Sequence, residues 1–450
     1  MQFRKVIVVV AVCIAAVVAA TTRSVVPARH RASLSDDLRA FTATHSTKVV
    51  RVIAHGTKED LHVIAARHGA HVARVLNDGA VLEANAAQIE ALASEPSIEH
   101  LSGDLPVADF MTVSTQATLA DKVRAGQGGG LLGLGGISGV NGQGVVVAVL
   151  DSGISAHKAL TGKVLASVSM VKGQPTTDEY GHGTHVAGII TGTGSYALGV
   201  TSLYAGGIAP GSQLVNVRVL GDDGVGNTSD VIAGIDWVIA NKARYNIKIM
   251  NLSLGHAVTE PVAFDPLCAA VERAYRAGIV VVAAAGNAGK MADGTPVLGG
   301  IASPGNSPFA ITVGATNTFG TPSRDDDKVT TYSSRGPTKY DNNAKPDLAA
   351  PGNKIVSLEA PNSYIATNYP SEHIAGSGNN AYLRMSGTSM SAPHVTGIAA
   401  RQFQQHPAYT PGDVRIVLAL DAARQGLAPL DSPASGYTFD GVREGVAIAP

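Results

Sequence analysis

Four short segments of the chain carry side chains that together could hydrolyse an amide bond. In the first, Ser389 lies among small residues in Gly387-Thr-Ser-Met-Ser-Ala-Pro393, a pattern that allows a sharp turn before a helix. We expect Pro393 in the first turn of that helix, where its missing N–H is no loss. The free N–H groups and positive dipole at this end of a helix would stabilise an anionic intermediate. Because such a serine often only caps a helix, the interpretation depends on the other segments.

The other three segments supply a base, an acid and an amide. His182 has a glycine on each side, and the ordinary pKa of a histidine, about 6.5, suits proton transfer at neutral pH. Asp151 would hold the His182 ring in one tautomer and stabilise its charged form. The side-chain amide of Asn287 would donate to the oxyanion, with the Ser389 backbone N–H as second donor. We therefore predict Ser389 as nucleophile, His182 as general base and then acid, and Asp151 as orienting acid.

Two more histidines lie close to these residues in the sequence. His185 follows His182 but lacks a glycine on each side, and His394 follows Ser389 on the same predicted helix. We interpret both as packed structural side chains.

The elements that must position these residues alternate between strands and helices from residue 145 onward. This alternation predicts an α/β fold with a mostly parallel sheet and helices on both faces. Predicted strands end next to Asp151, Ser253 and Asn287, and the carboxyl ends of parallel strands share one edge of the sheet. The predicted strands are 145–150, 214–220, 247–252, 279–284 and 309–313, and the predicted helices are 182–190, one capped near Thr228 or Ser229, 267–277, and two starting at Ser389 and about Pro411.

The chain before the sheet divides into three parts. Residues 1–20 have a basic start, an apolar run and small residues at the end, which is typical of a secretory signal peptide. Residues 48–107 show the order β-α-β-β-α-β with a turn at Asn77-Asp-Gly79, the ferredoxin-like arrangement of a small domain. Residues 112–144 are rich in glycine, which indicates a flexible connection, and they lack the Gly-Lys-Ser/Thr of a phosphate-binding loop.

Composition excludes several classes of protein. Hydrophobic residues make up 45% of the 450 residues and charged ones 15%, which describes a well-buried globular protein. The formal net charge of -1 gives no basic surface for nucleic acid, so we expect no nucleic-acid partner. If residues 1–20 are removed, Cys268 is the one cysteine left, and its helical setting predicts a small buried side chain.

Taken together, the four segments resemble the signature blocks of the subtilisin family of serine endopeptidases. They are Asp151-Ser-Gly, His182-Gly-Thr-His-Val-Ala-Gly, Ala285-Gly-Asn287 and Gly387-Thr-Ser-Met-Ser-Ala-Pro393. The resemblance implies a subtilisin-like catalytic domain over residues 140–436, a C-terminal tail over 437–450, and a processing region with a glycine-rich linker over 108–139. It also implies that the 48–107 domain is an inhibitory propeptide that the enzyme cuts off, with the mature chain starting between about residues 108 and 120.

The resemblance further implies how a substrate would bind. Ser253, Leu254 and Gly255 would pair with the substrate backbone as an added strand. Their segment and the segment Ala284, Ala285 and Gly286 would wall the pocket for the side chain before the cut, with Ala302 near its floor. These small uncharged walls suggest a broad preference for large apolar or aromatic side chains, which His256 could bias.

The chain departs from the family in two stretches. Residues 324–328 and 361–380 look like surface insertions, and no clear calcium-binding loop follows the His182 helix. Asp325, Asp326 and Asp327 could hold Ca²⁺, although a solvated charged turn is the simpler interpretation. We expect no metal site in the catalytic machinery and no cofactor for catalysis, with structural calcium possible but not indicated by a clear motif.

We therefore predict an exported, self-processing endopeptidase that acts as a monomer on proteins or peptides. Two other functions compete with this prediction. One is a secreted scaffold that has lost activity and only holds peptides; the presence of all four catalytic groups argues against it. The other is a nucleotide-binding α/β domain, which Asp151-Ser-Gly-Ile-Ser argues against because it lacks the Gly-x-Gly-x-x-Gly fingerprint.

Overall fold

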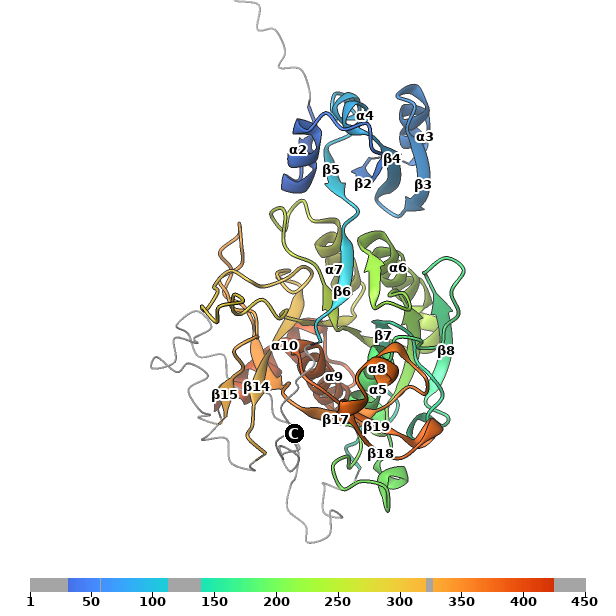
Figure 1. Cartoon of the computed structure of the whole chain (residues 1–450), viewed down its shortest axis with the longest axis vertical. Helices are drawn as coiled ribbons and strands as arrows, with labels where there is room; N and C mark the ends of the chain where they lie inside the picture. Colours follow the sequence, from blue (N-terminus) through green and yellow to red (C-terminus); the bar gives the residue numbers. More distant parts are fainter. Residues whose placement is uncertain (1–30, 57, 112–138, 321–326, 425–450) are drawn as a thin grey trace, which may run out of the picture.

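The chain folds into two units joined by one extended strand (Figure 1). The computed structural model describes residues 31–56, 58–111, 139–320 and 327–424. The predicted signal peptide, most of the glycine-rich linker and the C-terminal tail lie outside these residues.

The larger unit is built on a mostly parallel sheet, as the alternating pattern predicted. Its strands run in the order β15-β14-β13-β11-β7-β9-β8, and β16 pairs with β14. All neighbours are parallel except β14 and β15. The strands are β7 (Val146–Asp151), β8 (Val164–Ser169), β9 (Gln213–Arg218), β11 (Ile247–Leu252), β13 (Val280–Ala284), β14 (Ala310–Asn317), β15 (Lys328–Val329) and β16 (Leu348–Pro351).

Helices cover both faces of this sheet. On one face lie α5 (His182–Thr191), α9 (Thr388–Gln405) and α10 (Pro411–Arg424), and on the other α6 (Thr228–Tyr245) and α7 (Pro266–Arg276). Alternate residues of β7 show why: Val147 and Val149 join the core with α5 and α9, whereas Ala148 and Leu150 join the core with α6 and α7. Since successive strand residues point to opposite faces, a strand that is apolar throughout requires both layers.

The cap of α6 differs from the prediction by at least one residue. Thr228 is already the first helical residue, and Asn227 is the N-cap. The Asp230 carboxylate accepts hydrogen bonds from the Asn227 backbone N–H at 3.3 Å and from its side-chain amide at 2.8 Å. Three consecutive residues here, Asn227, Thr228 and Ser229, all suit a cap, so residue preference alone does not choose among them.

The smaller, N-terminal unit has the predicted β-α-β-β-α-β order. It consists of β2 (Val50–His55), α3 (Lys58–Arg67), β3 (His71–Leu76), β4 (Gly79–Ala84), α4 (Ala86–Leu92) and β5 (His100–Gly103). The unit starts earlier than residue 48, because β1 (Ser33–Leu34) pairs with β5 and α2 (Asp36–Ala43) packs on the same unit. In α2 only Leu38 and Thr42 are buried, too few to make a periodic pattern in the sequence.

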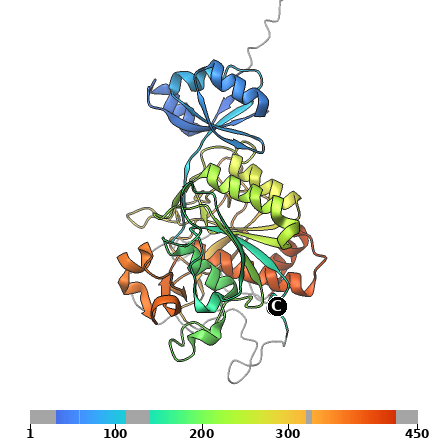
Figure 2. The same ribbon diagram turned by 90° about the vertical axis from the view of Figure 1, so that its right-hand side faces the viewer.

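One face of the N-terminal sheet rests on the larger unit. Ile53, Leu76 and Val81 lie in the same core as the residues of α6 and α7. The helices α3 and α4 lie on the opposite side of this sheet (Figure 2), whereas α2 begins at Asp36, whose N–H donates to Thr259 O of the larger unit at 3.2 Å. The two units therefore bury apolar side chains against each other.

Strand β6 (Pro106–Asp109) leaves the N-terminal unit and runs into the larger one (Figure 1). It lies between β10 (Val225–Asn227) and β12 (Leu254–Gly255) and is antiparallel to both. The boundary expected at residue 107 thus falls inside a strand that belongs to the larger unit by its pairing.

The stretch expected as a surface insertion at 361–380 contains regular structure. It includes α8 (Tyr364–Asn368) and the short 3-10 helices η3 (Pro370–Glu372) and η4 (Gly378–Asn380). Its strand β18 (His373–Ala375) completes a sheet with β19 (Tyr382–Met385) and β17 (Ile355–Leu358). Two more 3-10 helices, η1 (Lys158–Leu160) and η2 (Gly194–Ala197), lie in the larger unit.

Candidate active site

Asp151 and His182 meet at the carboxyl edge of the central sheet. Asp151 is the last residue of β7, and His182 is the first residue of α5. Nδ1 of His182 lies 2.7 Å from Oδ1 of Asp151, and both side chains are buried. A carboxylate at this distance fixes the ring so that Nδ1 carries a proton and Nε2 is left to accept one.

Two residues that the sequence analysis missed hold α5 in place. The buried Asp178 carboxylate accepts hydrogen bonds from the backbone N–H groups of Gly181 and Thr184, both at 2.7 Å, and from the Ser152 hydroxyl at 2.8 Å. The Ser152 hydroxyl in turn accepts from Gly183 N–H at 3.0 Å. These bonds satisfy N–H groups that an α-helix start leaves free, so they set the position of His182.

The electrostatic setting of His182 favours its charged form. Burial alone would lower the pKa of His182, but the carboxylates of Asp151, Asp109 and Asp178 outweigh burial and raise this pKa to about 9. The site therefore stabilises the imidazolium that forms when the ring takes a proton.

Ser389 is the second residue of α9, and it too reaches the carboxyl edge of the sheet. Its backbone C=O accepts a hydrogen bond from the Ser253 hydroxyl at 2.9 Å. In a regular helix that carbonyl would accept from residue 393, which is proline and has no N–H. Pro393 thus lies beyond the first turn, contrary to the prediction, and Ser253 supplies the missing donor.

The Ser389 hydroxyl does not pair with His182 in this structure. It donates to the Ser253 carbonyl at 2.9 Å and accepts from the Phe110 N–H at 2.8 Å. Within the described part of the chain, Nε2 of His182 is buried without a hydrogen-bond partner.

Asn287 aims its amide at the carbonyl of Phe110. Its Nδ2 donates to Phe110 O at 2.7 Å, while its Oδ1 accepts from the backbone N–H and the hydroxyl of Thr388, both at 3.1 Å. The Thr388 contacts fix which way the amide points. A donor in this position would stabilise negative charge on the oxygen it faces.

The segments expected to bind substrate surround residues 106–110. In β12, Leu254 pairs with Asp109, and Gly255 pairs with Ala108. The Phe110 ring lies directly on Gly255: a Cβ atom at residue 255 would be only 2.8 Å from Cζ of the Phe110 ring.

The second segment expected to bind substrate, residues 284–286, contacts Ala302. Ala302 N–H donates to Ala285 O at 3.0 Å, and the Ala302 methyl would lie 3.2 Å from a Cβ at Gly286. Ala284 ends β13 and is buried.

The remaining histidines have structural contacts. Nε2 of His185 donates to the carbonyls of Ile355 and Leu383 at 3.1 and 3.2 Å. Burial and the charge of His182 lower its pKa to about 3, so it stays neutral. Nδ1 of His394 donates to Met390 O at 2.7 Å, and Nδ1 of His256 donates to its neighbour Ala257 O at 2.9 Å.

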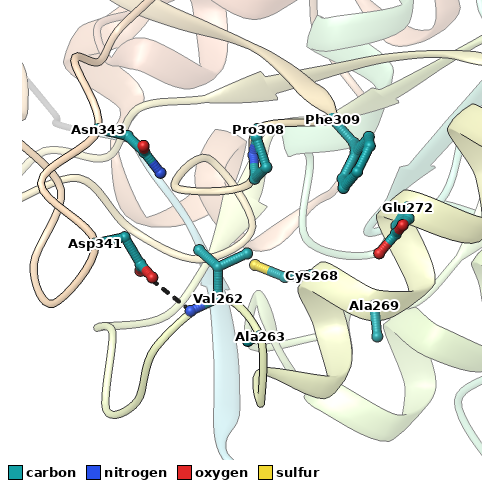
Figure 3. A pocket seen from close by; sticks show the side chains of 9 residues that line it. All are labelled: Val262, Ala263, Cys268, Ala269, Glu272, Pro308, Phe309, Asp341 and Asn343. Atoms are coloured by element: carbon teal, nitrogen blue, oxygen red, sulfur yellow. Dashed lines mark hydrogen bonds between the residues drawn. The ribbon is translucent and has the colours of Figure 1, made fainter.

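A separate pocket of about 310 Å³ lies between α7 and the loops that follow β12 and β15 (Figure 3). Asp341 accepts from Val262 N–H at 3.1 Å at its edge. The Cys268 thiol lies inside it, and burial raises the pKa of this thiol well above its ordinary value. None of its lining residues belongs to the site described above: Val262, Ala263, Cys268, Ala269, Glu272, Pro308, Phe309, Asp341 and Asn343.

No group of three or more His, Cys, Asp or Glu side chains that could hold a metal ion occurs in the described ranges. Asp325 and Asp326, considered above as calcium ligands, lie outside these ranges. Among the helices that the structure describes, none is long and apolar enough to cross a membrane.

Comparison with known proteins gives a consistent result. The chain matches the model of the subtilase family over residues 142–436. It is 40% identical to the serine protease AprX of Bacillus subtilis (strain 168) over 349 residues, 75% of this chain and 72% of that protein. It is 32% identical to the M-protease of Shouchella clausii (strain KSM-K16) over 335 residues, 74% of this chain and 71% of that protein.

The fold agrees with a solved structure of the same group. Fervidolysin from Fervidobacterium pennivorans, described as a keratinolytic enzyme related to subtilisin, superposes with a TM-score of 0.68. The match has 22% sequence identity and covers 93% of this chain but only 62% of that protein. From the family match, the related proteases and the shared fold, we conclude that this chain belongs to the subtilase family and is a serine-type endopeptidase.

Proposed function

We propose that this protein is an exported, self-processing endopeptidase in which Asp151, His182 and Ser389 form the catalytic triad. Asn287 and the Ser389 backbone N–H form the oxyanion site. Residues 31–110 act as an inhibitory propeptide, which the enzyme removes by cutting between Phe110 and Met111.

One observation supports this proposal: residues 106–109 lie between β10 and β12, which we take as the substrate cleft, and Phe110 contacts Ser389 and Asn287. Strand β6 pairs with β12 and β10, the mode in which an extended peptide adds to a sheet edge. The Phe110 carbonyl oxygen is 2.7 Å from the Asn287 amide, and its N–H is 2.8 Å from the Ser389 hydroxyl. The bond that follows this carbonyl is therefore the one in position to be cut.

The chemistry follows from the groups at that carbonyl. Ser389 Oγ attacks the Phe110 carbonyl carbon while Nε2 of His182 takes the hydroxyl proton, and Asp151 stabilises the resulting imidazolium. The carbonyl oxygen becomes an oxyanion facing Asn287. His182 then gives its proton to the Met111 nitrogen, which leaves as an amine, and water later hydrolyses the Ser389 ester by the same steps in reverse.

Contacts of the N-terminal unit support its role as an inhibitor. The Asp104 carboxylate accepts from the Ser229 N–H at 2.8 Å at the start of α6, and Arg74 forms a 2.8 Å ion pair with Asp230. Nε2 of His100 is 2.5 Å from Oε2 of the buried Glu260. These contacts would hold the severed unit in place and keep residues 106–110 in the cleft.

The same cleft suggests the substrates. The Phe110 ring on Gly255 and the small walls Ala284, Ala285, Gly286 and Ala302 favour a large apolar side chain before the cut. Val107, three residues earlier, is fully buried in the core with Leu254. We infer a preference for peptides with apolar side chains at both positions. The active enzyme would be a monomer that has lost its signal peptide and needs no cofactor.

A purified precursor tests the proposal directly. The parent chain should yield a fragment starting at Met111, identified by N-terminal sequencing and intact mass. Ser389→Ala should remain full length while keeping its folded circular dichroism spectrum. If Ser389→Ala is processed like the parent in a protease-free preparation, the assignment of the nucleophile and of self-cleavage is wrong.

A further inference from the structure

Asn287 lies on a loop, so its amide needs support from outside its own segment. Strand β13 ends at Ala284, and residues 285–287 belong to no helix or strand. The contacts with Thr388 fix the direction of the Asn287 side chain, but they leave open what holds the backbone that carries it. An oxyanion donor is effective only when it is held at the place where charge develops. The backbone around Asn287 must therefore be anchored.

Ser334 binds the backbone on both sides of Asn287. Its N–H donates to the carbonyl of Gly286 at 2.9 Å, and its hydroxyl accepts from the N–H of Ala288 at 3.0 Å. Ser334 is fully buried and is 46 residues away from Ala288 along the chain. This one distant residue thus brackets the Asn287 backbone with two hydrogen bonds.

Gly286 allows Ser334 to approach so closely. Its φ of +101° is a backbone conformation that favours glycine. A Cβ atom at residue 286 would be 2.9 Å from Oγ of Ser334. The hydroxyl of Ser334 therefore lies directly against the backbone that precedes Asn287, and a side chain at residue 286 would push the two segments apart.

The segment that carries Ser334 is itself anchored. The hydroxyl of the preceding residue, Ser333, accepts from the Ala315 N–H of β14 at 3.0 Å. The next residue, Arg335, donates from Nη1 to Gly289 O at 2.6 Å. These contacts tie the segment to the central sheet and to the loop that it supports. Ser334 is therefore a fixed point for that loop.

We propose that Ser334 is a positioning residue for the oxyanion site, which acts on the reaction through Asn287. The proposal rests on the function above, in which the Asn287 amide stabilises the oxyanion. Without the Ser334 hydroxyl, the Ala288 N–H loses its acceptor, and the Asn287 backbone is held on one side only. The amide then stabilises the developing charge less well, whereas binding of the uncharged substrate changes little.

The test compares the rates at which folded precursors cleave themselves, followed by intact mass. The precursors are the parent, Ser334→Ala, Asn287→Ala and the double variant. Loss of one hydrogen bond in the transition state corresponds to about 3- to 10-fold in rate, which is the effect expected of Ser334→Ala. Asn287→Ala should be slower than the parent by about 10²- to 10³-fold, the range typical of removing one oxyanion donor. Because Ser334 acts through Asn287, the double variant should be no slower than Asn287→Ala.

Ser333→Ala is the matched control. It removes a buried hydroxyl acceptor from the same segment, but one that bonds to β14 and not beside Asn287, so it should cleave at the parent rate. Ser334→Cys is a second variant in case Ser334→Ala does not fold, because sulfur is a weak acceptor; it should be slowed in the same range. Circular dichroism of each precursor checks that it is folded.

A second measurement uses processed parent and processed Ser334→Ala on a peptide with Phe before the cut. The value of kcat should fall by the same 3- to 10-fold with KM unchanged, since only the transition state loses an interaction. The proposal would be overturned by losses that multiply in the double variant, by a parent rate in Ser334→Ala, by an equal loss in Ser333→Ala, or by a loss that appears in KM alone. An Asn287→Ala precursor as fast as the parent, or a parent precursor that stays uncleaved, would instead count against the proposed function.

Discussion

The bond proposed for self-cleavage depends on how Phe110 fills the pocket before the cut, and this can be perturbed at one residue. Fully burying a phenylalanine side chain is worth about 1.5–3 kcal/mol. The Phe110 ring lies on Gly255 but remains partly exposed, so we take the lower part of that range. At about 1.36 kcal/mol for each factor of ten, Phe110→Ala should slow self-cleavage by about 10- to 30-fold.

A short series of variants sharpens this prediction. Phe110→Leu keeps most of the apolar area and should lose less than Phe110→Ala. Phe110→Asp places a carboxylate against small uncharged walls and should lose at least about 100-fold, because a buried unpaired charge is costly. The assay follows loss of the precursor by intact mass after refolding, with Ser389→Ala as the uncleaved control. An Ala variant as fast as the parent, or a parent product that does not start at Met111, would refute the reasoning.

Three more predictions concern the groups around Phe110. Cleavage needs neutral His182, and the carboxylates of Asp151, Asp109 and Asp178 outweigh burial and raise the pKa of His182 to about 9. Self-cleavage should therefore speed up about tenfold per pH unit until near pH 9. Asp109→Asn should move this limb of the pH profile to lower pH, and a rate that is flat from pH 6 to 9 would contradict the prediction. Asp151→Asn should lower kcat by about 10⁴-fold with little change in KM, as measured on a peptide with Phe before the cut; a loss below tenfold would argue against the triad. Asp178→Ala, made in the Ser389→Ala background, should lower the free energy of unfolding by about 2–4 kcal/mol, because the Ser152 hydroxyl and the N–H groups of Gly181 and Thr184 lose their acceptor. A denaturant titration measures this change, and an unchanged midpoint would exclude the capping role of Asp178.

The sequence alone determined the class of fold and the catalytic residue types. Runs such as Val146–Leu150 are apolar at every position, and such runs alternating with helices require a parallel sheet between two helical layers. Because the carboxyl ends of these strands share one edge, Asp151 and Asn287 could be placed together without coordinates. The four-block pattern then indicated a protease.

Only the tertiary structure decided how these residues interact. Asp178 caps α5, although nothing in its local sequence distinguishes it from other acidic residues, because its partners depend on where β7 and α5 meet. Pairing of β6 with β10 and β12 joins segments more than a hundred residues apart. That pairing places Phe110 at Ser389 and Asn287. Local pattern fixes which face of an element is buried, whereas contacts between distant segments are set by packing of the whole chain.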